Sequence, residues 1–558
     1  MMIHMPHRLS HFCYTCMTVL TSGFFLCGCN QNTPTDSDSA YANLETLDIS
    51  IGYWNIEDMT NIQKDAMRDY VEERFSIQIN PISVDWSNYK EYYQMLSVTN
   101  SLPDVFATLT ISSNDTNDSA YYESLISSGS IQPLPDDLSA WPNLEKLMEQ
   151  FDYTRYSDGH FYAIPRISFN DSILACSDAA MIVRRDWMEN LGLDDPQTID
   201  EFIELIAAFA NDDPDQNGID DTIGYNVNAL NALGKWVMLG IAPDCNTYSW
   251  IEQDGSYIPS WYSDEFRDVV TAYRKMYETG GLDPDFYLKN PNEVIADFAS
   301  GHLGALEFKS SPGSIQLLEE QWNLYNDKPF EECVDVLPMF AAPDGTIYCN
   351  SSTPFWSESF ISSSVTEEKM ERILALFDFL LSEDGLHMSK YGLENVDYKI
   401  DSSGNYTCLL DTENSSLVTL LENKYPSITL FGGLATWGGS DDDFALNEMN
   451  FARYGKHCVV LANKDVTWNK EHAALIERPY DFLISPKESS ELFSTTNAFS
   501  CFVKAIIGSD PALSMWDDSI EELKKQGLDE YIKRQNDSYH TLQEQKQKIT
   551  KARKQNAV

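Results

Sequence analysis

Strand and helix patterns alternate in the stretch that follows the first forty residues. The segment LDISIGYW at 47–54 alternates apolar and polar side chains, as a half-buried strand does. The expected strands are 47–54, 76–84 and 103–107, and the expected helices between them are 60–75, with Thr60 as N-cap, and 89–97. This β-α-β-α-β order predicts a mostly parallel sheet covered by helices.

The carboxyl ends of such strands are where ligands collect in open α/β sheets. In this chain those ends correspond to residues 54–58, from Trp54 to Asp58, and to residues 107–110. The sequence therefore places a candidate binding site at these two strand ends.

A second α/β run begins near Tyr162. Residues 179–187 predict a strand that leads into a short helix, with Asp186 as its N-cap, Glu189 as the capping-box partner and Gly192 at its end. Thr198 and Glu201 form another capping box, which opens a helix through Phe209. Two further helices are expected within 264–286 and over 367–385.

The N-terminal segment has the layout of a secretory signal. A weakly basic start containing Arg8 precedes a short apolar core at 17–26, which is too short to span a bilayer. Leu26-Cys27-Gly28-Cys29 then resembles a bacterial lipobox, in which Cys29 would receive the lipid and become the mature N-terminus. We expect a signal peptide over 1–28 and a flexible, polar tether over 29–45. The alternative is an ordinary cleaved signal with a chance cysteine.

Charge and length restrict the classes of partner and fold. The chain has 38 Lys+Arg against 87 Asp+Glu, a formal net charge of −49, so nucleic acid and anionic lipid surfaces would be repelled. The only membrane contact expected is through the lipid anchor. With 558 residues the chain exceeds one usual hydrophobic core, which predicts two lobes.

The cysteines after the leader do not form a recognisable framework. They are odd in number and dispersed, without a CxxC pair, which argues against a zinc site built from such pairs and against a dense disulfide framework. They are Cys176, Cys245, Cys333, Cys349, Cys408, Cys458 and Cys501. One or two disulfides are compatible with this pattern.

Oxygen-bearing side chains cluster in the segment DPDQNGIDD at 213–221. Such spacing suits either a hard cation, which takes oxygen ligands, or a solvated polar loop. The candidate ligands are Asp213, Asp215, Asn217, the Ile219 carbonyl and Asp221, and Gly218 permits the sharp bend between them.

Several phrases, in this order, resemble the substrate-binding lipoproteins of carbohydrate ABC importers, extracellular solute-binding protein family 1. They are PDVFA (103–107), YAIPR (162–166), VRRDWMENLGLDDPQTIDEF (183–202), DPDQNGIDDTIGY (213–225), TGGLDPDF (279–286), FDFLLSEDGLHMSKYGLENVDY (377–398) and IIGSDPALSMWDDSIEELKKQGLDEYI (506–532). The resemblance extends over nearly all of the chain after the tether.

The resemblance implies a two-lobe periplasmic-binding-protein-like fold of type II, with α/β lobes joined by a hinge and a sugar held between them. The chain would cross between lobes near residues 160, 312 and 400. Lobe 1 would contain 46–160 and 312–400, and lobe 2 would contain 161–311 and 401–558. Both lobes would then be discontinuous in sequence.

The same resemblance implies a structural calcium ion in the loop 213–221, because a similar loop holds calcium in related alginate-binding members. This sequence departs from the pattern in that Thr222 stands where members often carry Glu. Position twelve of an EF-hand loop is Gly224 rather than Glu, so a bidentate ligand is missing.

The candidate sugar-binding residues combine aromatic rings with hydrogen-bonding side chains, because sugars present apolar C–H faces and hydroxyl rims. Trp54, Glu57 and Asp58 follow the first strand, and Thr108 ends the third. The remaining candidates lie near expected crossings or in glycine-containing loops, and they are Tyr162, Arg166, Trp236, Trp356 and Trp437. Trp54 and Trp437 would face the sugar from opposite walls. For each residue, packing in a core is the competing interpretation.

The sequence therefore predicts a lipid-anchored protein on the extracytoplasmic face of the cell membrane that binds a carbohydrate and delivers it to ABC permease subunits. An enzyme is the rival class, but GxSxG, HExxH and P-loop patterns are absent, and abundant carboxylates alone decide nothing. A surface carbohydrate-processing enzyme, a sensor or an adhesin with the same fold are the alternatives.

Overall fold

Two sheets, each with its own covering of helices, organise the described part of the chain. The computed structural model describes residues 41, 44–54, 56, 64–112, 116–168, 179–228, 233–245, 250–350, 355–413, 415–436, 440–476, 482, 485, 488 and 490–556. Three two-stranded ladders also lie within these residues, and they are formed by β7 (Trp250–Gln253) with β8 (Ser256–Pro259), β11 (Tyr348–Asn350) with β15 (Ala474–Ile476), and β13 (Tyr398–Ile400) with β14 (Tyr406–Cys408).

The first sheet has the strand order β2-β1-β3-β12-β4. Its strands are β1 (Leu47–Tyr53), β2 (Ile77–Ser83), β3 (Val105–Thr108), β4 (Ala163–Ile167) and β12 (Phe355–Ile361). β1 is parallel to both β2 and β3, whereas β12 is antiparallel to β3 and β4. The three strands expected from the sequence, and their parallel pairing, are therefore confirmed.

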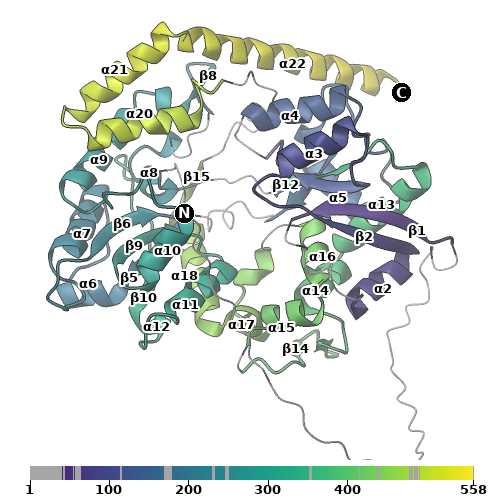
Figure 1. The fold of residues 1–558 in the computed structure, drawn as a ribbon, viewed down its shortest axis with the longest axis horizontal. Coiled ribbons are helices and arrows are strands. Elements are labelled where there is room, and N and C mark those ends of the chain that lie inside the picture. The colour runs from purple at the N-terminus through teal and green to yellow at the C-terminus, as the bar shows by residue number, and fades with distance from the viewer. Residues whose placement is uncertain are drawn as a thin grey trace, which may run out of the picture. The chain divides into compact units, whose positions relative to one another are not determined.

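The helices around this sheet share its hydrophobic core. They are α2 (Ala66–Phe75), α3 (Tyr89–Val98), α4 (Thr116–Ser127), α5 (Pro142–Gln150), α13 (Glu367–Leu380), α14 (Glu383–Tyr391), α15 (Leu417–Lys424), α16 (Ile428–Leu434) and α17 (Glu448–Tyr454). α2 contacts β2, and α13 contacts both α2 and β1 (Figure 1). The carboxylate of Asp65 caps α2 by accepting a hydrogen bond from the Arg68 N–H at 2.9 Å, and the predicted N-cap Thr60 lies outside the described residues.

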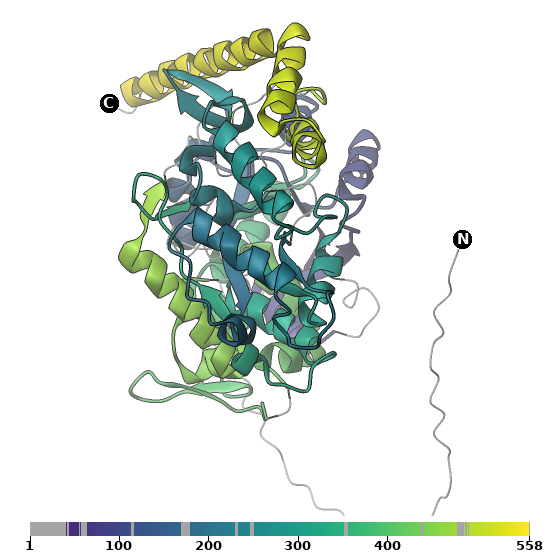
Figure 2. The same ribbon diagram turned by 90° about the vertical axis from the view of Figure 1, so that its left-hand side faces the viewer.

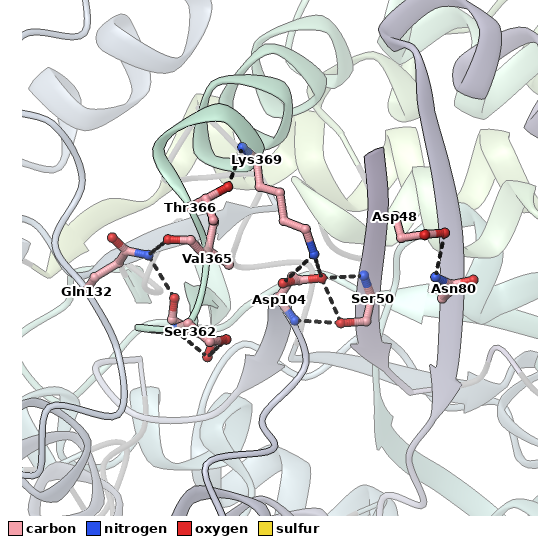
Figure 3. A network of polar contacts seen from close by, with 10 residues as sticks. Asp48, Ser50, Asn80, Asp104, Gln132, Ser362, Val365, Thr366 and Lys369 are labelled. Carbon is pink, nitrogen blue, oxygen red and sulfur yellow. Dashed lines mark hydrogen bonds and ion pairs between the residues drawn. The ribbon is translucent and has the colours of Figure 1, made fainter. Parts of the chain in front are cut away.

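A polar network fastens β3 to β1 and to the start of α13 (Figure 3). Asp104 Oδ2 accepts hydrogen bonds from the backbone N–H and the hydroxyl of Ser50, at 2.8 and 2.9 Å. Lys369 Nζ lies 3.1 and 3.0 Å from the two carboxylate oxygens of Asp104. Because Asp104 is buried and fully bonded, this residue of the PDVFA phrase has a structural role.

The second sheet has the strand order β10-β5-β9-β6. Its strands are β5 (Ala180–Arg184), β6 (Ile223–Val227), β9 (Leu303–Phe308) and β10 (Val334–Leu337). β6 is parallel to β9, and β5 is antiparallel to both β9 and β10. Along β5, Met181 and Val183 enter one core while Ala180 and Ile182 enter another, so helices cover both faces of this sheet.

The helices of the second sheet divide between these faces. α7 packs its apolar side chains into the first of the two cores and α10 into the second, and both contact β6 and β9 (Figure 1). α22 contacts the β7–β8 hairpin, which lies beneath it in Figure 2. The helices are α6 (Arg185–Leu191), α7 (Ile199–Asn211), α8 (Lys235–Leu239), α9 (Phe266–Glu278), α10 (Pro291–Ala299), α11 (Pro312–Trp322), α12 (Phe330–Cys333), α18 (Lys456–His472), α20 (Thr495–Ile507), α21 (Ala512–Lys525) and α22 (Leu528–Asn556).

Two helix predictions are wrong in detail. α6 starts at Arg185, and Asp186 does not cap it, because both of its carboxylate oxygens are bonded to the guanidinium of Arg184. The helix expected over 367–385 is two helices, because Ser382 caps a new helix by accepting a hydrogen bond from the Gly385 N–H at 3.2 Å. Gly192 ends α6 in the left-handed conformation and Thr198 caps α7, as predicted.

Two segments pack differently from the lobe boundaries expected at 312 and 400. Residues 312–337 lie with the second sheet, because β10 pairs with β5 and α11 joins its core. Residues 417–435 lie in the core of the first sheet. The remaining lobe boundaries stay predictions.

Candidate functional site

The carboxyl edge of the first sheet gathers aromatic side chains from three strands. β1 and β2 are parallel, so Trp54 and Trp86, which follow them, emerge at the same edge. β12 runs in the opposite direction, which brings its first residues, including Trp356, to this edge as well. The tertiary structure thus joins two residues predicted from the sequence, Trp54 and Trp356.

The rings of these tryptophans pack against one another and against Tyr89. Trp54 lies with its ring centroid 5.1 Å from Trp86 and 5.8 Å from Trp356, and Trp86 lies 5.4 Å from Trp356. Trp86 stacks on Tyr89 at 5.1 Å with an interplanar angle of 21°. Trp54 is 2% exposed, whereas Trp86 is 49% exposed and Trp356 is half-buried. We call these three tryptophans the tryptophan platform.

The sequence patterns did not predict Trp86 as a site residue. It lies three residues beyond the end of β2, a position comparable to that of Trp54 beyond β1. Applying the strand-end rule to the second strand as well as to the first and third would have identified it.

A bulge in β12 positions Trp356. The pairing of β12 with β4 shifts register between Phe355 and Glu358, and Ser357 has a positive φ of 62°. Bulges of this kind redirect side chains at sheet edges. The Ser357 N–H donates to Ser112 Oγ at 2.8 Å, which ties the bulge to the loop after β3.

Glu358 organises that loop from beneath. Its buried carboxylate accepts hydrogen bonds from the N–H and hydroxyl of Thr110, at 2.9 and 2.7 Å, and from the Ser112 N–H at 2.7 Å. Burial raises the pKa of Glu358, while the bonds from Thr110 and Ser112 oppose that rise. Thr108, a predicted ligand residue, is fully buried and lies opposite Glu358 in the sheet, so it belongs to this support.

Arg166 lies directly behind the platform. Its guanidinium carbon is 4.4 Å from the ring centroid of Tyr53 and 5.6 Å from that of Trp54, and its Nε donates to the Gly433 carbonyl at 2.6 Å. Arg166 is fully buried, and this burial lowers the pKa of its guanidinium. Arg166 is therefore placed to hold the aromatic rings rather than to reach solvent.

A cavity of about 280 Å³ adjoins this edge. Tyr53 and Trp54 form part of its lining, together with Lys390, Glu422 and Arg453. Arg453 Nη1 donates to Asp443 at 2.6 Å, and Lys390 lies 3.7 Å from the same carboxylate. The cavity thus combines aromatic surface with groups that bond hydroxyls, the combination that sugar sites use.

The loop 213–221 connects α7 to β6 and folds its oxygen-bearing side chains together. Asn217 Nδ2 donates to Asp215 at 2.8 Å and to Asp221 at 3.3 Å, and both oxygens of Asp213 accept from the Gly218 N–H. This donor set fits a hard cation. The loop precedes β6, so it lies at the edge of the second sheet opposite its carboxyl edge.

Gly224 cannot be replaced by the glutamate of an EF-hand. A Cβ at this position would lie 2.1 Å from the Ile206 carbonyl oxygen and 2.4 Å from that of Gly281. Close packing of β6 against α7 therefore explains why the twelfth position lacks a bidentate ligand.

No family model matches the chain, but three curated proteins do. The chain is 26% identical over 410 residues to Lipoprotein LipO of Bacillus subtilis, which covers 72% of this chain and 76% of LipO. It is 26% identical over 288 residues to the polygalacturonan/rhamnogalacturonan-binding protein YtcQ of the same organism, covering 50% of this chain and 54% of YtcQ. It is 27% identical over 280 residues to the fructooligosaccharide ABC transporter substrate-binding protein FusA of Streptococcus pneumoniae, covering 47% of this chain and 48% of FusA.

Solved structures share the fold over almost the whole chain. A solute-binding protein of Bifidobacterium longum infantis described as binding HMO has a TM-score of 0.64 at 17% identity, covering 88% of this chain and 98% of that protein. An EF-hand mutant of FusA with fructo-nystose has a TM-score of 0.61 at 17% identity, covering 89% and 99%.

The chain is similar in sequence to LipO, YtcQ and FusA, of which FusA is named as an ABC transporter substrate-binding protein. Its fold is the two-lobe periplasmic-binding-protein-like fold of the solved solute-binding proteins, as the resemblance implied. In the described residues, no helix combines the length and apolar composition needed to cross a membrane.

The remaining predicted site residues that the structure describes do not lie at the tryptophan platform. Trp236, on α8, is buried in the core of the second sheet, with its ring centroid 4.7 Å from Phe340. The Tyr162 hydroxyl donates to Asp158 at 2.9 Å, away from the platform tryptophans. Glu57, Asp58, Trp437 and the lipobox Cys29 lie outside the described residues.

Proposed function

We propose that the protein is the lipid-anchored, extracytoplasmic substrate-binding protein of an ABC importer, and that it captures an oligosaccharide for delivery to the permease. The observation that carries this proposal is the tryptophan platform at the carboxyl edge of the first sheet. Trp86 offers a half-exposed ring that is already packed against Trp54 and Trp356. A sugar ring gains by stacking its C–H face on such a surface.

The platform is preorganised, which favours binding because little side-chain freedom is lost. Arg166 lies behind it, and Glu358 fixes the loop after β3. The adjoining cavity supplies charged groups, Lys390, Glu422 and Arg453, for hydroxyl contacts. LipO, YtcQ and FusA support the transport role, since FusA and YtcQ are named for saccharide binding and LipO is named as a lipoprotein.

The mechanism would be closure of two lobes on the ligand without chemistry. A sugar that contacts both lobes stabilises the closed form by its differential affinity for that form. Trp437 remains the candidate for the opposite wall. The sugar would then be released intact to the permease.

A panel of neutral and acidic oligosaccharides tests the proposal by thermal shift with the purified protein. A cognate sugar at a concentration of about a hundred times its Kd stabilises the folded protein by about 2.7 kcal/mol, so the melting temperature should rise clearly. Trp86→Ala should abolish most of this rise, whereas Tyr325→Ala, which removes a 57% exposed ring elsewhere, should keep it. Equal responses of the two variants, or turnover of the sugar by the pure protein, would overturn the proposal.

The anchor is tested separately. Cys29→Ala should release the protein from washed membranes or leave it unprocessed, because the cysteine thiol is the lipid acceptor. A neighbouring change, Cys27→Ala, should leave anchoring intact. Retention of the Cys29 variant at the wild-type level would show that the lipobox is not used.

We further propose that the loop 213–221 binds calcium, with Asp213, Asp215, Asn217, the Ile219 carbonyl and Asp221 as ligands. A solved structure of FusA, to which the chain is similar, is named as that of an EF-hand mutant. Chelation should lower the melting temperature, and calcium should restore it better than magnesium, which demands tighter octahedral geometry. The double change Asp213→Ala and Asp215→Ala should remove this response. Asp401→Ala, which alters another exposed Asp turn, should retain it.

A further inference from the structure

A cluster of three different metal-binding side chains lies between α11 and α18. Glu319 on α11 meets His457 and Cys458, which are consecutive at the start of α18. His457 Nε2 lies 2.8 Å from Glu319 Oε1, Cys458 Sγ lies 3.3 Å from Glu319 Oε2, and Cys458 Sγ lies 3.5 Å from His457 Nε2. None of these residues belongs to the tryptophan platform or to the loop 213–221.

Packing of the two helices brings this cluster together. Leu318 on α11 and Ala462 on α18 lie in the same core beside the second sheet, and the helices contact each other directly. Cys458 is fully buried, whereas Glu319 and His457 are partly exposed. A ligand could therefore reach the cluster from solvent while one of its contacts lies in the interior.

The separations match those of ligands around one tetrahedral ion. Zinc bonds of about 2.3 Å to sulfur and about 2.0–2.2 Å to nitrogen or oxygen place tetrahedral ligands about 3.3–3.6 Å apart. The two distances that involve Cys458 Sγ already agree with this range. The 2.8 Å separation of His457 Nε2 from Glu319 Oε1 would have to widen by about half an ångström. His457 and Cys458 contact different oxygens of Glu319, so the carboxylate would also have to rotate to bind through one oxygen, or bind through both.

We propose that Glu319, His457 and Cys458 bind a zinc ion that links α11 to α18, with a water completing the tetrahedron. Thiolate and imidazole are borderline-soft ligands that favour zinc over calcium or magnesium.

A metal-free arrangement is the competing interpretation. In that case Glu319 and His457 form an ion pair, and the Cys458 thiol donates a hydrogen bond to Glu319. Burial and the charge of Glu319 raise the pKa of the Cys458 thiol well above its ordinary value, so without a cation the thiol stays protonated. The metal would displace that proton to solvent.

Cobalt(II) substitution distinguishes the two arrangements in the purified full-length protein after removal of bound metal. We expect a thiolate-to-cobalt charge-transfer band, together with the visible bands of tetrahedral cobalt, and displacement of both by one equivalent of zinc. Cys458→Ser should remove the thiolate band and raise the Kd for zinc at least about tenfold. Changes to residues that only contact the metal ligands already weaken metal binding by about that much, so loss of a ligand should weaken it no less.

Two further variants guard against a folding defect in Cys458→Ser. His457→Gln and Glu319→Gln change partly exposed side chains and should also weaken zinc binding. Cys501→Ser, which removes another free cysteine on α20, should bind zinc like the wild type. A charge-transfer band that persists in Cys458→Ser, or zinc affinity unchanged in all three ligand variants, would overturn the proposal.

Discussion

The carboxyl edges of the two sheets each have tryptophan and a buried glutamate nearby, but their surroundings differ. At the first edge, Trp86 is half-exposed and the platform adjoins a cavity. At the second edge, the start of α8 lies against Glu307 of β9, and Trp236 of α8 packs into the core. Glu307, near the end of β9, is buried close to the Tyr225 hydroxyl and the Val237 N–H, each 3.4 Å away.

This difference shows that a tryptophan near a strand end does not by itself mark a ligand site. The loop after β2 leaves Trp86 at the surface, whereas Gly234 lets the start of α8 approach the second edge closely. A Cβ at Gly234 would lie 2.2 Å from both the Glu307 carboxylate and the Tyr225 hydroxyl. The loop or helix that packs against the strand ends, and not the strand itself, therefore determines which edge is accessible to a ligand.

Replacing Trp236 should give the largest effect on stability. Trp236→Ala should lower the free energy of unfolding by about 3–5 kcal/mol, because it empties a packed core position. Denaturant unfolding measures this loss. Trp86→Ala, which removes a half-exposed ring, serves as the matched control and should cost less than about 1 kcal/mol. Similar losses for the two variants would contradict the contrast between the edges.

Glu307 makes the second edge sensitive to pH. Burial raises the pKa of Glu307 from 4.5 to about 7, so the protonated carboxyl stabilises the fold below about pH 4.5 and this stabilisation is lost as the pH rises through 7. Glu307→Gln should therefore gain stability relative to the wild type by up to about 3 kcal/mol between those pH values. Urea unfolding across this range measures the difference. A constant difference would mean that Glu307 keeps its ordinary pKa.

The fold of the first sheet depends on the polar network around Asp104, and variants of that network test this dependence. Asp104→Ala should cost about 2–3 kcal/mol, because it leaves the Ser50 N–H and the Lys369 ammonium without their charged acceptor. Asp48→Ala, in the same view of Figure 3, breaks only an exposed contact with Asn80 and should change stability by less than about 0.5 kcal/mol. Thermal unfolding of the two variants measures the difference. Equal losses of stability would mean that the Asp104 network does not stabilise the fold.

Replacement of Trp86 should have the smallest effect on the free energy of unfolding but a clear effect on the affinity for sugar. Trp86→Ala should weaken binding of the cognate oligosaccharide by about 1–3 kcal/mol, because an aromatic contact is lost. Trp86→Phe should restore part of that loss, because a smaller ring still stacks. Isothermal titration measures both variants. Wild-type affinity in Trp86→Ala would remove the platform from the site.

The alternation of strands and helices could be predicted from the sequence because it depends on local periodicity. The sequence of 47–107 predicted β1, β2, β3 and α3 to within two residues at each end. The lipobox and the spacing of oxygen donors in 213–221 are also local patterns. The resemblance to substrate-binding proteins, and with it the two-lobe fold and the expectation of a sugar ligand, rested on phrases that follow the family's order along the chain.

Tertiary structure decided which residues meet, because that depends on strand order and on what covers each edge. Trp54 and Trp356 are about three hundred residues apart, and only the antiparallel insertion of β12 between β3 and β4 brings them together. The same holds for Glu319 with Cys458, which meet because α11 and α18 share a core. Burial of Trp236 on α8 likewise depends on close packing at Gly234, which no periodicity in the sequence predicts.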